Sequence, residues 1–521
     1  MGWQHGYFAD EGYSYGVHPH QAPARIALAA LLQGHRSPDL TGPFHYLDLG
    51  CGQGLMTCLL AAAHPQARFT GVDFHPEHVA HAQRLATSCG LTNVTFLEAD
   101  FLELAERLPE DWPPVDFAVA HGIASWIAPP VRTALLKLAS RALRPGGLFY
   151  VSYNTFPGWL SMVPFQHLVA SFQQRLQPGR PALEAARALF GRLEEAQASL
   201  LRLQPQLPNR LAELAKQDPA YLVQEYNNGY WQPLFVDQMI GEAAEAKLTF
   251  VGTATLVEAI EANYSEAQRK LLAEASDPAM RELCRDLLIT QNFRRDVYAK
   301  GADRLWPAQR LPRLEQLQVV ALVGPETLER DDLFTFATSL GTVNGKPDVY
   351  RPLLEALQSG PVSLEALQRQ LGGLQPSGEP LKLNTLLQGL AFLLEKNLVS
   401  LVPDAGVDPR PAQRFNAAVV VAISDGAPYT ALATPLGGNA QGIQLDWALA
   451  LDGLRLGLPA DQLAGHVLQK LVGLGKTMKG EDGQLLTQSQ ALSTLQQRTI
   501  QPLLACGLPY LQSLGSWPAQ P

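Results

Sequence analysis

An alternation of short apolar segments with amphipathic segments between residues 44 and 154 limits the fold of this chain more than any other feature. The apolar segments are five or six residues long and rich in β-branched and aromatic side chains. That composition is typical of strands covered on both faces of a sheet. They are Phe44–Leu49, Arg68–Asp73, Val94–Glu98, Val115–Ala120 and Leu148–Ser152. Repeated strand–helix units of this length predict a parallel, doubly wound (Rossmann-like) α/β sheet with right-handed crossovers.

Two of the intervening segments carry clear helix signals. Pro76–Cys89 and Pro130–Leu143 place apolar residues at helical spacing, and each is followed by glycine, at Gly90 and at Gly146. Proline in the first turn and glycine just beyond the last turn are the expected ends of a helix. We therefore expect helices over both segments.

The rest of the chain predicts further units. With 521 residues, several domains are expected. The chain is strongly helical from Trp159 to about Lys247, and we interpret Leu248–Thr253 and Gln318–Val323 as the last two strands of the core sheet. Residues 348–403 show the order helix, helix, long helix, strand, which is winged-helix-like. The apolar run Ala417–Ile423 suits a buried strand.

Composition excludes some classes of protein. The net charge of −9 gives no electrostatic basis for binding nucleic acid. The five cysteines are never spaced C-x-x-C, which favours a reducing compartment without disulfides or a zinc site. We expect neither a signal peptide nor a membrane span, and hence a cytoplasmic protein.

The segment Asp48–Gly54 has the strongest functional signal. It lies where the first strand meets a helix, and Gly50, Cys51, Gly52 and Gly54 would leave the backbone open to a ligand. Asp73 ends the second strand, where a carboxylate can accept hydrogen bonds from both hydroxyls of a ribose.

Further residues at the strand ends favour a nucleoside ligand. Asp100 follows the third strand and could accept a hydrogen bond from an adenine amino group, while Phe74 or Phe101 could pack on the purine. The glycine spacing is G-x-G-x-G, unlike the G-x-G-x-x-G of dinucleotide folds. Asp48 is poorly suited to a pyrophosphate, but it suits a cationic sulfonium ligand that also carries an ammonium group. The pattern therefore favours S-adenosylmethionine over NAD.

These residues, together with Leu143–Gly147 before the fifth strand, resemble the motif set of class I S-adenosylmethionine-dependent methyltransferases. The strings Ala120–Trp126 and Val151–Trp159 are similar to those of methyltransferases with a methyltransferase regulatory domain, a group that includes the rickettsial protein lysine methyltransferases. The resemblance continues through Tyr221–Gly301 and covers roughly residues 10–320. It departs at Ala124, where the related pattern usually has an aromatic residue.

The resemblance implies roles for individual residues. Gly50, Gly52 and Gly54 would line the methionine end of the cofactor, Asp73 the ribose and Asp100 the adenine, with His121 and Gly122 beneath it. Together with the order of the predicted elements beyond residue 320, it predicts four domains. They are a methyltransferase core in residues 1–160, helical insertions and the regulatory domain in 161–325, a winged-helix-like domain in 346–404 and a C-terminal α/β domain in 409–521.

Methyl transfer from a sulfonium depends mainly on positioning the acceptor. If the acceptor is a lysine amine, burial beside a cation would lower its pKa, so no strong general base is required. Aromatic and amide side chains at the mouth of the pocket could orient the amine. The candidates are Tyr13, Tyr15, Trp126, Tyr153, Asn154 and Trp159.

Other interpretations are less favoured. Asn154–Pro157 resembles the N-P-P-Y motif of amino-methylating DNA enzymes only faintly, and it follows the wrong strand. The set His75, His78 and His81 has no accompanying ligands for a metal, and we expect a solvated helix face. The long helix Leu383–Leu398 lacks the side chains of a DNA-recognition helix, which favours a structural or protein-docking role.

The sequence thus predicts a methyltransferase that acts on a protein side chain, with lysine favoured by the resemblance alone. A small-molecule methyltransferase and a non-catalytic cofactor-binding scaffold are the alternatives. No nucleic-acid partner, metal or membrane contact is expected, and the sequence leaves the oligomeric state open.

Overall fold

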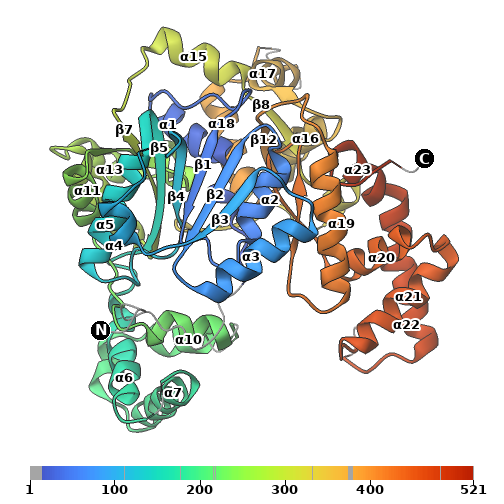
Figure 1. Cartoon of the computed structure of the whole chain (residues 1–521), viewed down its shortest axis with the longest axis horizontal. Coiled ribbons are helices and arrows are strands. Elements are labelled where there is room, and N and C mark those ends of the chain that lie inside the picture. The colour runs from blue at the N-terminus through green and yellow to red at the C-terminus, as the bar shows by residue number, and fades with distance from the viewer. Residues whose placement is uncertain are drawn as a thin grey trace.

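A seven-stranded sheet forms the centre of the computed structural model (Figure 1). The structure describes residues 15–110, 112–176, 178–214, 216–217, 219–330, 332–373, 379–480 and 483–519. In spatial order, the strands are β3 (Val94–Glu98), β2 (Arg68–Asp73), β1 (His45–Leu49), β4 (Val115–Ala120), β5 (Leu143–Asn154), β7 (Phe293–Lys300) and β6 (Leu248–Thr253). Strands β1 to β5 pair in parallel, which confirms the predicted doubly wound sheet.

The far edge of the sheet differs from the expectation. Strand β7 pairs antiparallel with both β5 and β6, so Phe293–Lys300 supplies the strand that we assigned to Gln318–Val323. That assignment was wrong, because β8 (Gln318–Ala321) lies in a separate three-stranded sheet between β11 (Val362–Ser363) and β12 (Val399–Val402). The run in β8 is apolar, whereas β7 contains charged residues that pair with one another in the interior.

Helices cover both faces of the central sheet, because each presents an apolar side to it. On one face the buried residues belong to α1 (Pro23–Leu32), α2 (Leu55–Ala63) and α3 (Pro76–Ser88). On the other face they belong mainly to α5 (Pro129–Ala142) and α11 (Val236–Glu245), with α4 (Phe101–Glu106) packed alongside. Helices α12 (Leu256–Ala259), α13 (Glu266–Ala273) and α14 (Pro278–Ile289) connect β6 to β7.

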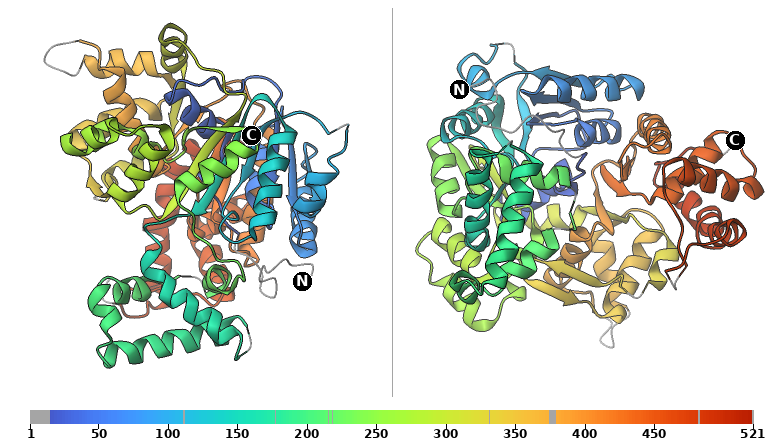
Figure 2. Two further views of the ribbon diagram at one scale, coloured as in Figure 1. Left: turned by 90° about the vertical axis from the view of Figure 1, so that its left-hand side faces the viewer. Right: turned by 90° about the horizontal axis from the view of Figure 1, so that it is seen from below.

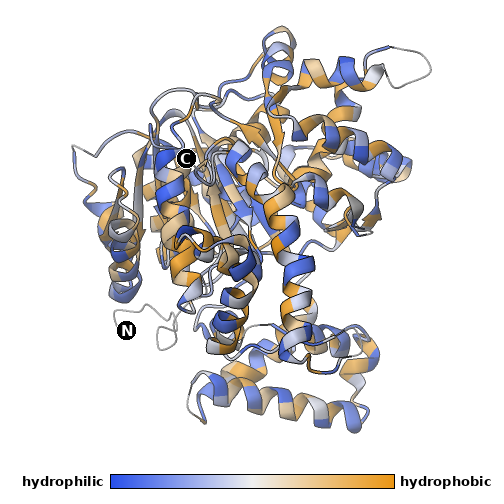
Figure 3. Cartoon of the chain, turned by 90° about the vertical axis from the view of Figure 1, so that its right-hand side faces the viewer, coloured by the Kyte–Doolittle hydropathy of each residue, from blue (hydrophilic) through white to orange (hydrophobic). Residues whose placement is uncertain are grey.

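The helical region after β5 projects from the body as a lobe, seen at the bottom of the left view in Figure 2. Its helices are α6 (Val163–Gln173), α7 (Arg180–Glu195), α8 (Ser199–Leu203), α9 (Leu207–Leu214) and α10 (Pro219–Asn227). They carry both apolar and polar residues (Figure 3), and the apolar ones enclose a separate small core around Phe165, Phe190 and Tyr226. The lobe returns to the sheet through α10 and α11.

The remaining elements pack beside the sheet. Helix α15 (Pro307–Gln316) leads to β8, the hairpin β9 (Thr335–Thr338) and β10 (Gly341–Asn344), and then α16 (Pro347–Gln358), α17 (Leu364–Gly372) and α18 (Leu383–Glu395). The predicted order of three helices followed by a strand is therefore present. Division of the chain into domains at the residues named above stays a prediction.

The C-terminal segment packs directly on α2. It contains α19 (Arg410–Ser424), β13 (Ala431–Thr434), β14 (Asn439–Gly442), α20 (Leu445–Arg455), α21 (Ala460–Gly473), α22 (Gln488–Leu495) and α23 (Leu508–Ser513). The expected strand over Ala417–Ile423 was wrong, since this run lies in α19 and buries Val419, Val420 and Ile423. None of the helices in the described ranges combines the length and apolar character needed to cross a membrane.

Candidate functional site

The turn between β1 and α2 has the backbone that its glycines make possible. Gly50, Gly52 and Gly54 all have positive φ values, of 80°, 53° and 75°. That region of backbone space favours glycine. At Gly54 a Cβ atom would also lie 2.4 Å from the Cβ of Ala82 on α3. The turn is therefore held close to α3, with its peptide groups uncovered by side chains.

Two carboxylates lie beside this turn. Asp73, at the end of β2, accepts hydrogen bonds from the amides of Gly52 at 2.8 Å and His75 at 3.0 Å. Asp48, in β1, accepts a 2.6 Å hydrogen bond from the Thr57 hydroxyl. Burial raises the pKa of Asp48 to about 7, against the Thr57 hydrogen bond and with a contribution from Asp73. A buried carboxylate with a raised pKa favours a cationic ligand, because a nearby positive charge stabilises its ionised form.

A large cavity opens over these residues at the carboxyl ends of β1 to β4. Its empty volume, including the open mouth, is about 1210 Å³, compared with roughly 300–1,000 Å³ for typical ligand pockets. In a doubly wound sheet this edge is where ligands bind. Two other cavities, one beside α18 and one within the lobe, are much smaller, with empty volumes of about 300 and 210 Å³.

The structure brings together nearly all of the residues predicted to bind the cofactor. Those that line the cavity are Asp48, Gly50, Cys51, Gly52, Gly54, Asp73, Phe74, Asp100, Phe101 and His121. Gly122 is not in the lining, and its amide donates a 2.8 Å hydrogen bond to the Ser152 hydroxyl. Asp100 caps α4 by accepting a 2.6 Å hydrogen bond from the amide of Leu102. The donor set, with its acidic groups and exposed turn, fits an adenosyl ligand that carries positive charge.

A stacked pair of histidines forms part of the cavity wall. The rings of His18 and His121 lie 3.9 Å apart, and Nδ1 of His121 lies 3.0 Å from the Tyr150 hydroxyl. Burial lowers the pKa of His18 to about 4, and the nearby Arg295 contributes. Burial also lowers the pKa of His121. Both rings are therefore neutral near pH 7 and add no positive charge to the cavity.

Four of the six residues proposed to orient the acceptor separate into two pairs. Tyr15 and Trp126 line the cavity. Tyr153 and Asn154 do not line it, because the Tyr153 hydroxyl donates a 2.6 Å hydrogen bond to Asp296 and the Asn154 amide donates a 2.7 Å hydrogen bond to Glu225. Placing these two side chains at the mouth of the pocket was a wrong expectation.

Of the other candidates, Trp159 donates its indole hydrogen to the carbonyl of Asn292 at 2.7 Å. Tyr13 lies outside the described residues. Ala124, where the related pattern has an aromatic residue, is fully buried in the core of the sheet.

The histidines of α3 also differ from the expectation of a solvated face. His75 and His78 are buried, and Nδ1 of His78 lies 3.3 Å from Asp73. His81 bridges two parts of the chain: its ring lies 2.7 Å from the carbonyl of Gln53 and 3.0 Å from the hydroxyl of Tyr429. These histidines therefore support the glycine turn. No group of side chains within the described ranges has the arrangement of a metal site.

Sequence reasoning missed some residues of the cavity. His18 and Gln21 reach it from the segment before α1, and Ile123, Ile127 and Val131 reach it from beyond β4. Ile123 and Ile127 follow the end of a predicted strand, and this position could have indicated that they lie at the cavity. His18 and Gln21 gave none, because their contact with the cavity depends on tertiary packing.

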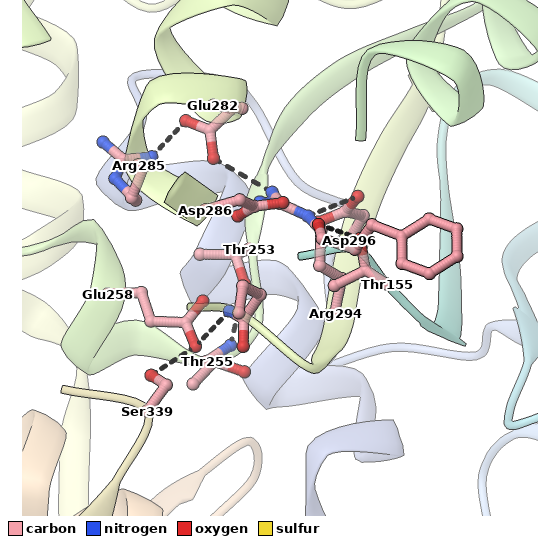
Figure 4. A network of polar contacts seen from close by, with 12 residues as sticks. Thr155, Thr253, Thr255, Glu258, Glu282, Arg285, Asp286, Arg294, Asp296 and Ser339 are labelled. Atoms are coloured by element: carbon pink, nitrogen blue, oxygen red, sulfur yellow. Dashed lines mark hydrogen bonds and ion pairs between the residues drawn. The ribbon is translucent and has the colours of Figure 1, made fainter. Parts of the chain in front are cut away.

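An ionic network lies behind the sheet edge (Figure 4). Its Asp296 accepts the hydrogen bond from the Tyr153 hydroxyl described above. The Arg294 guanidinium of β7 contacts Asp286 at 2.5 Å, Asp296 at 2.8 Å and Glu282 at 2.9 Å, with an exposed fraction of only 1% for its side chain. Arg285 forms a further ion pair with Glu282. The network joins α14 to the antiparallel strand of the central sheet.

Comparisons with known proteins agree with this geometry. Residues 47–147 match the model of a methyltransferase domain, and residues 218–300 match that of a predicted methyltransferase regulatory domain. An uncharacterized protein of Synechocystis is 35% identical over 395 residues, which cover 75% of this chain and 76% of that protein. A tRNA (guanine-N(7)-)-methyltransferase of Chloroflexus aggregans is 34% identical over 185 residues, 33% of this chain and 73% of that protein.

Among solved structures, PKMT2 from Rickettsia typhi in complex with AdoHcy superimposes with a TM-score of 0.68 at 17% identity. The superposition covers 94% of this chain and 98% of PKMT2. The fold, the cavity and the matched domain define an S-adenosylmethionine-dependent methyltransferase. Because both the methyltransferase domain and the predicted regulatory domain are matched, the chain belongs to the family of methyltransferases that carry this regulatory domain. The Synechocystis protein is a relative over most of its length.

Proposed function

We propose that this methyltransferase acts on the side-chain amine of lysine in a protein substrate. The observation that carries the proposal is the extent of the likeness to PKMT2, which covers 94% of this chain. The elements outside the donor-binding core therefore share the arrangement found in PKMT2. The tRNA methyltransferase relative, by contrast, matches only 33% of the chain.

Each carboxylate at the cavity has a distinct part in this proposal. Asp73 binds the ribose hydroxyls, Asp100 the adenine amino group and Asp48 the ammonium group of the methionine portion, while Phe74 or Phe101 packs on the purine. Bound S-adenosylmethionine supplies a methyl group whose bonding electron pair returns to sulfur as the acceptor nitrogen takes the carbon. The hydrogen bond from the Gly52 amide to Asp73 holds the turn in place beforehand.

The acceptor nitrogen must be uncharged when it reacts. A lysine ammonium has an ordinary pKa of about 10.4, and both burial and a neighbouring positive charge lower it. Tyr15 and Trp126 line the cavity and are the side chains that we propose to orient the amine. The neutral rings of His18 and His121 neither repel nor pair with it.

The test is incubation of the purified protein with tritium-labelled methyl donor and a bacterial lysate. We expect label in protein, and methyl-lysine after acid hydrolysis of the labelled bands. The Asp73→Ala variant serves as the control, since it should transfer no label. Label that enters only RNA or only small molecules would contradict the proposed substrate but not the class of enzyme.

A further inference from the structure

A buried carboxylate beside the donor cavity is unused by the mechanism above. Glu225, on α10, has an exposed fraction of 1%. Its Oε1 accepts hydrogen bonds from the Asn154 amide at 2.7 Å and the Trp231 indole at 3.0 Å, and its Oε2 accepts one from the Tyr221 hydroxyl at 3.3 Å. All of these donors are neutral.

This environment differs from that of the other buried acids near β7. Glu282, Asp286 and Asp296 share the guanidinium of Arg294, whereas Glu225 takes part in no ion pair among the described residues. An ionised carboxylate in the interior is costly unless a cation pairs with it. Burial raises the pKa of Glu225 to about 7, although its hydrogen bonds oppose the shift. Near neutral pH, Glu225 is therefore partly ionised without a paired cation. A ligand that carries positive charge could supply that cation.

Glu225 is directly connected to the wall of the donor cavity. The indole of Trp126, which lines the cavity, lies close enough to Glu225 to help lower the pKa of that carboxyl. The loop that carries Trp231 is joined to the loop of Trp126 by a 2.8 Å hydrogen bond from the Gln232 amide to the Ser125 carbonyl. The carboxylate thus lies one side chain away from the donor cavity.

Aromatic side chains lie around the Glu225 carboxylate. Trp126, Trp231 and Tyr221 all contact Glu225, and Tyr221 and Trp231 are half-buried. Aromatic faces attract ammonium groups, more strongly where water is excluded. The Tyr221 hydrogen bond is the longest of the three to Glu225, so it is the one that an entering group would most easily displace.

We propose that Glu225 binds the ammonium group of the acceptor lysine and takes its proton, with Trp126, Trp231 and Tyr221 around the ion pair. This inference rests on the proposed function. In the step itself, an N–H bond of the ammonium breaks and an O–H bond forms on Glu225. The nitrogen keeps the electron pair and becomes the neutral amine that accepts the methyl group. A carboxylate with a raised pKa is a better proton acceptor than an exposed one.

The experiment measures binding of n-butylammonium, a lysine side-chain mimic, to the full chain saturated with S-adenosylhomocysteine. Tryptophan fluorescence reports occupancy, and n-butanol serves as the uncharged probe. We expect n-butylammonium to bind the wild-type protein about tenfold more tightly than Glu225→Gln, with n-butanol unaffected. The affinity for S-adenosylhomocysteine, measured by calorimetry, should be the same in both proteins.

A matched control is Glu258→Gln. Glu258 is also buried and also accepts hydrogen bonds from neutral groups, the Gln291 amide at 2.7 Å and the Ser339 hydroxyl at 2.6 Å (Figure 4). It does not line the cavity. Its substitution should leave n-butylammonium binding unchanged. An equal loss in both variants would mean a general effect on folding and would overturn the inference.

A second measurement compares the pH dependence of the wild-type protein with that of Glu225→Gln, because Asp48 in the cavity also has a pKa of about 7. Binding of n-butylammonium to the wild-type protein should weaken as the pH falls from 8 to 6, because Glu225 becomes protonated. The titratable groups around Glu225 are Tyr221, Tyr226 and, beyond it, Arg210. Burial raises the pKa of Tyr226, which moves it further from this interval, and an arginine stays charged throughout it. Binding independent of pH, or of Glu225, would refute the inference even if methyl-lysine is found in the lysate experiment.

Discussion

At the scale of single residues, the preference of the cavity for a cationic ligand comes from carboxylates. Their ionisation depends on burial and on neighbouring charges. Asp48 is buried with one hydroxyl donor, and its pKa is raised to about 7. A cationic ligand stabilises the ionised form, so ligand binding and loss of the proton are linked. The affinity for a cation must therefore depend on pH in the range where Asp48 titrates.

We expect the affinity for S-adenosylmethionine to rise as the pH increases from about 6 to 7.5, since Asp48 loses its proton over that interval. Calorimetry at several pH values measures the effect. In Asp48→Asn the pH dependence over this range should disappear, and binding should be about tenfold weaker at the upper end. His18 and His121 titrate lower and do not obscure the result. A pH dependence that persists in the variant would show that another group is responsible.

Asp73→Ala should weaken binding of S-adenosylhomocysteine by about 100-fold or more. The variant loses the proposed ribose contacts as well as the hydrogen bonds to the amides of Gly52 and His75, and hydrogen bonds to a charged group contribute roughly 1.5–3 kcal/mol each. Calorimetry gives the affinity and circular dichroism checks the fold. The exposed Asp461→Ala is a suitable control and should bind normally. Undiminished binding by Asp73→Ala would remove this residue from the site.

The sequence predicted residues at strand ends well, because parallel strands bring their carboxyl ends to one edge. Asp48, Asp73 and Asp100 meet there for that reason. It failed for Tyr153 and Asn154, whose side chains form hydrogen bonds with Asp296 and Glu225. Those partners come from distant segments, so no local pattern indicates which way the side chains point.

At the scale of elements, the most consequential feature is the ionic network that joins β7 to α14. Arg294 contacts three carboxylates in the interior. Removal of one partner from such a group leaves buried charges without compensation. The network therefore fixes the place of the antiparallel strand.

We expect Arg294→Met to lower the free energy of unfolding by about 3–5 kcal/mol, because three carboxylates lose their shared cation. Denaturation in urea measures the change. Arg369, whose pair with Glu365 is exposed, provides the comparison: Arg369→Ala should cost about 0.5 kcal/mol or less. Similar values for the two variants would contradict a stabilising role for the network.

In the elements that sequence analysis misassigned, the residue pattern does not match the structure that forms. Strand β7 contains Arg294 and Asp296, and charged residues are rarely buried in a strand unless partners from elsewhere neutralise them. The run Ala417–Ile423 is rich in β-branched residues but forms part of α19, since one side packs on neighbouring elements. Tertiary packing overrode local preference in both cases.

At the scale of the whole molecule, the C-terminal segment and the donor-binding core share one hydrophobic core. Residues of α2, α19 and β13 belong to the same buried cluster, and His64 at the end of α2 lies 3.0 Å from the carbonyl of Gly438. One side of α2 would be exposed to water without these elements. The C-terminal segment is thus part of what keeps the donor site folded.

A chain that ends at residue 408 should therefore melt at least about 5 °C below the full-length protein, or aggregate, because it exposes apolar residues of α2. Thermal denaturation and size-exclusion chromatography distinguish these results. A monodisperse fragment with unchanged melting temperature and cofactor affinity would show that the C-terminal segment is an independent unit.

The position of β7 in the chain has a consequence for biosynthesis. Its partner β5 ends at Asn154, whereas β7 begins only at Phe293, after the lobe and α11 to α14. During translation the backbone of β5 thus presents an unpaired edge until β7 has been synthesised. Open strand edges invite intermolecular pairing. We therefore expect chaperones to bind the nascent chain during that interval. Nascent chains on ribosomes stalled before residue 293 should be prone to aggregation.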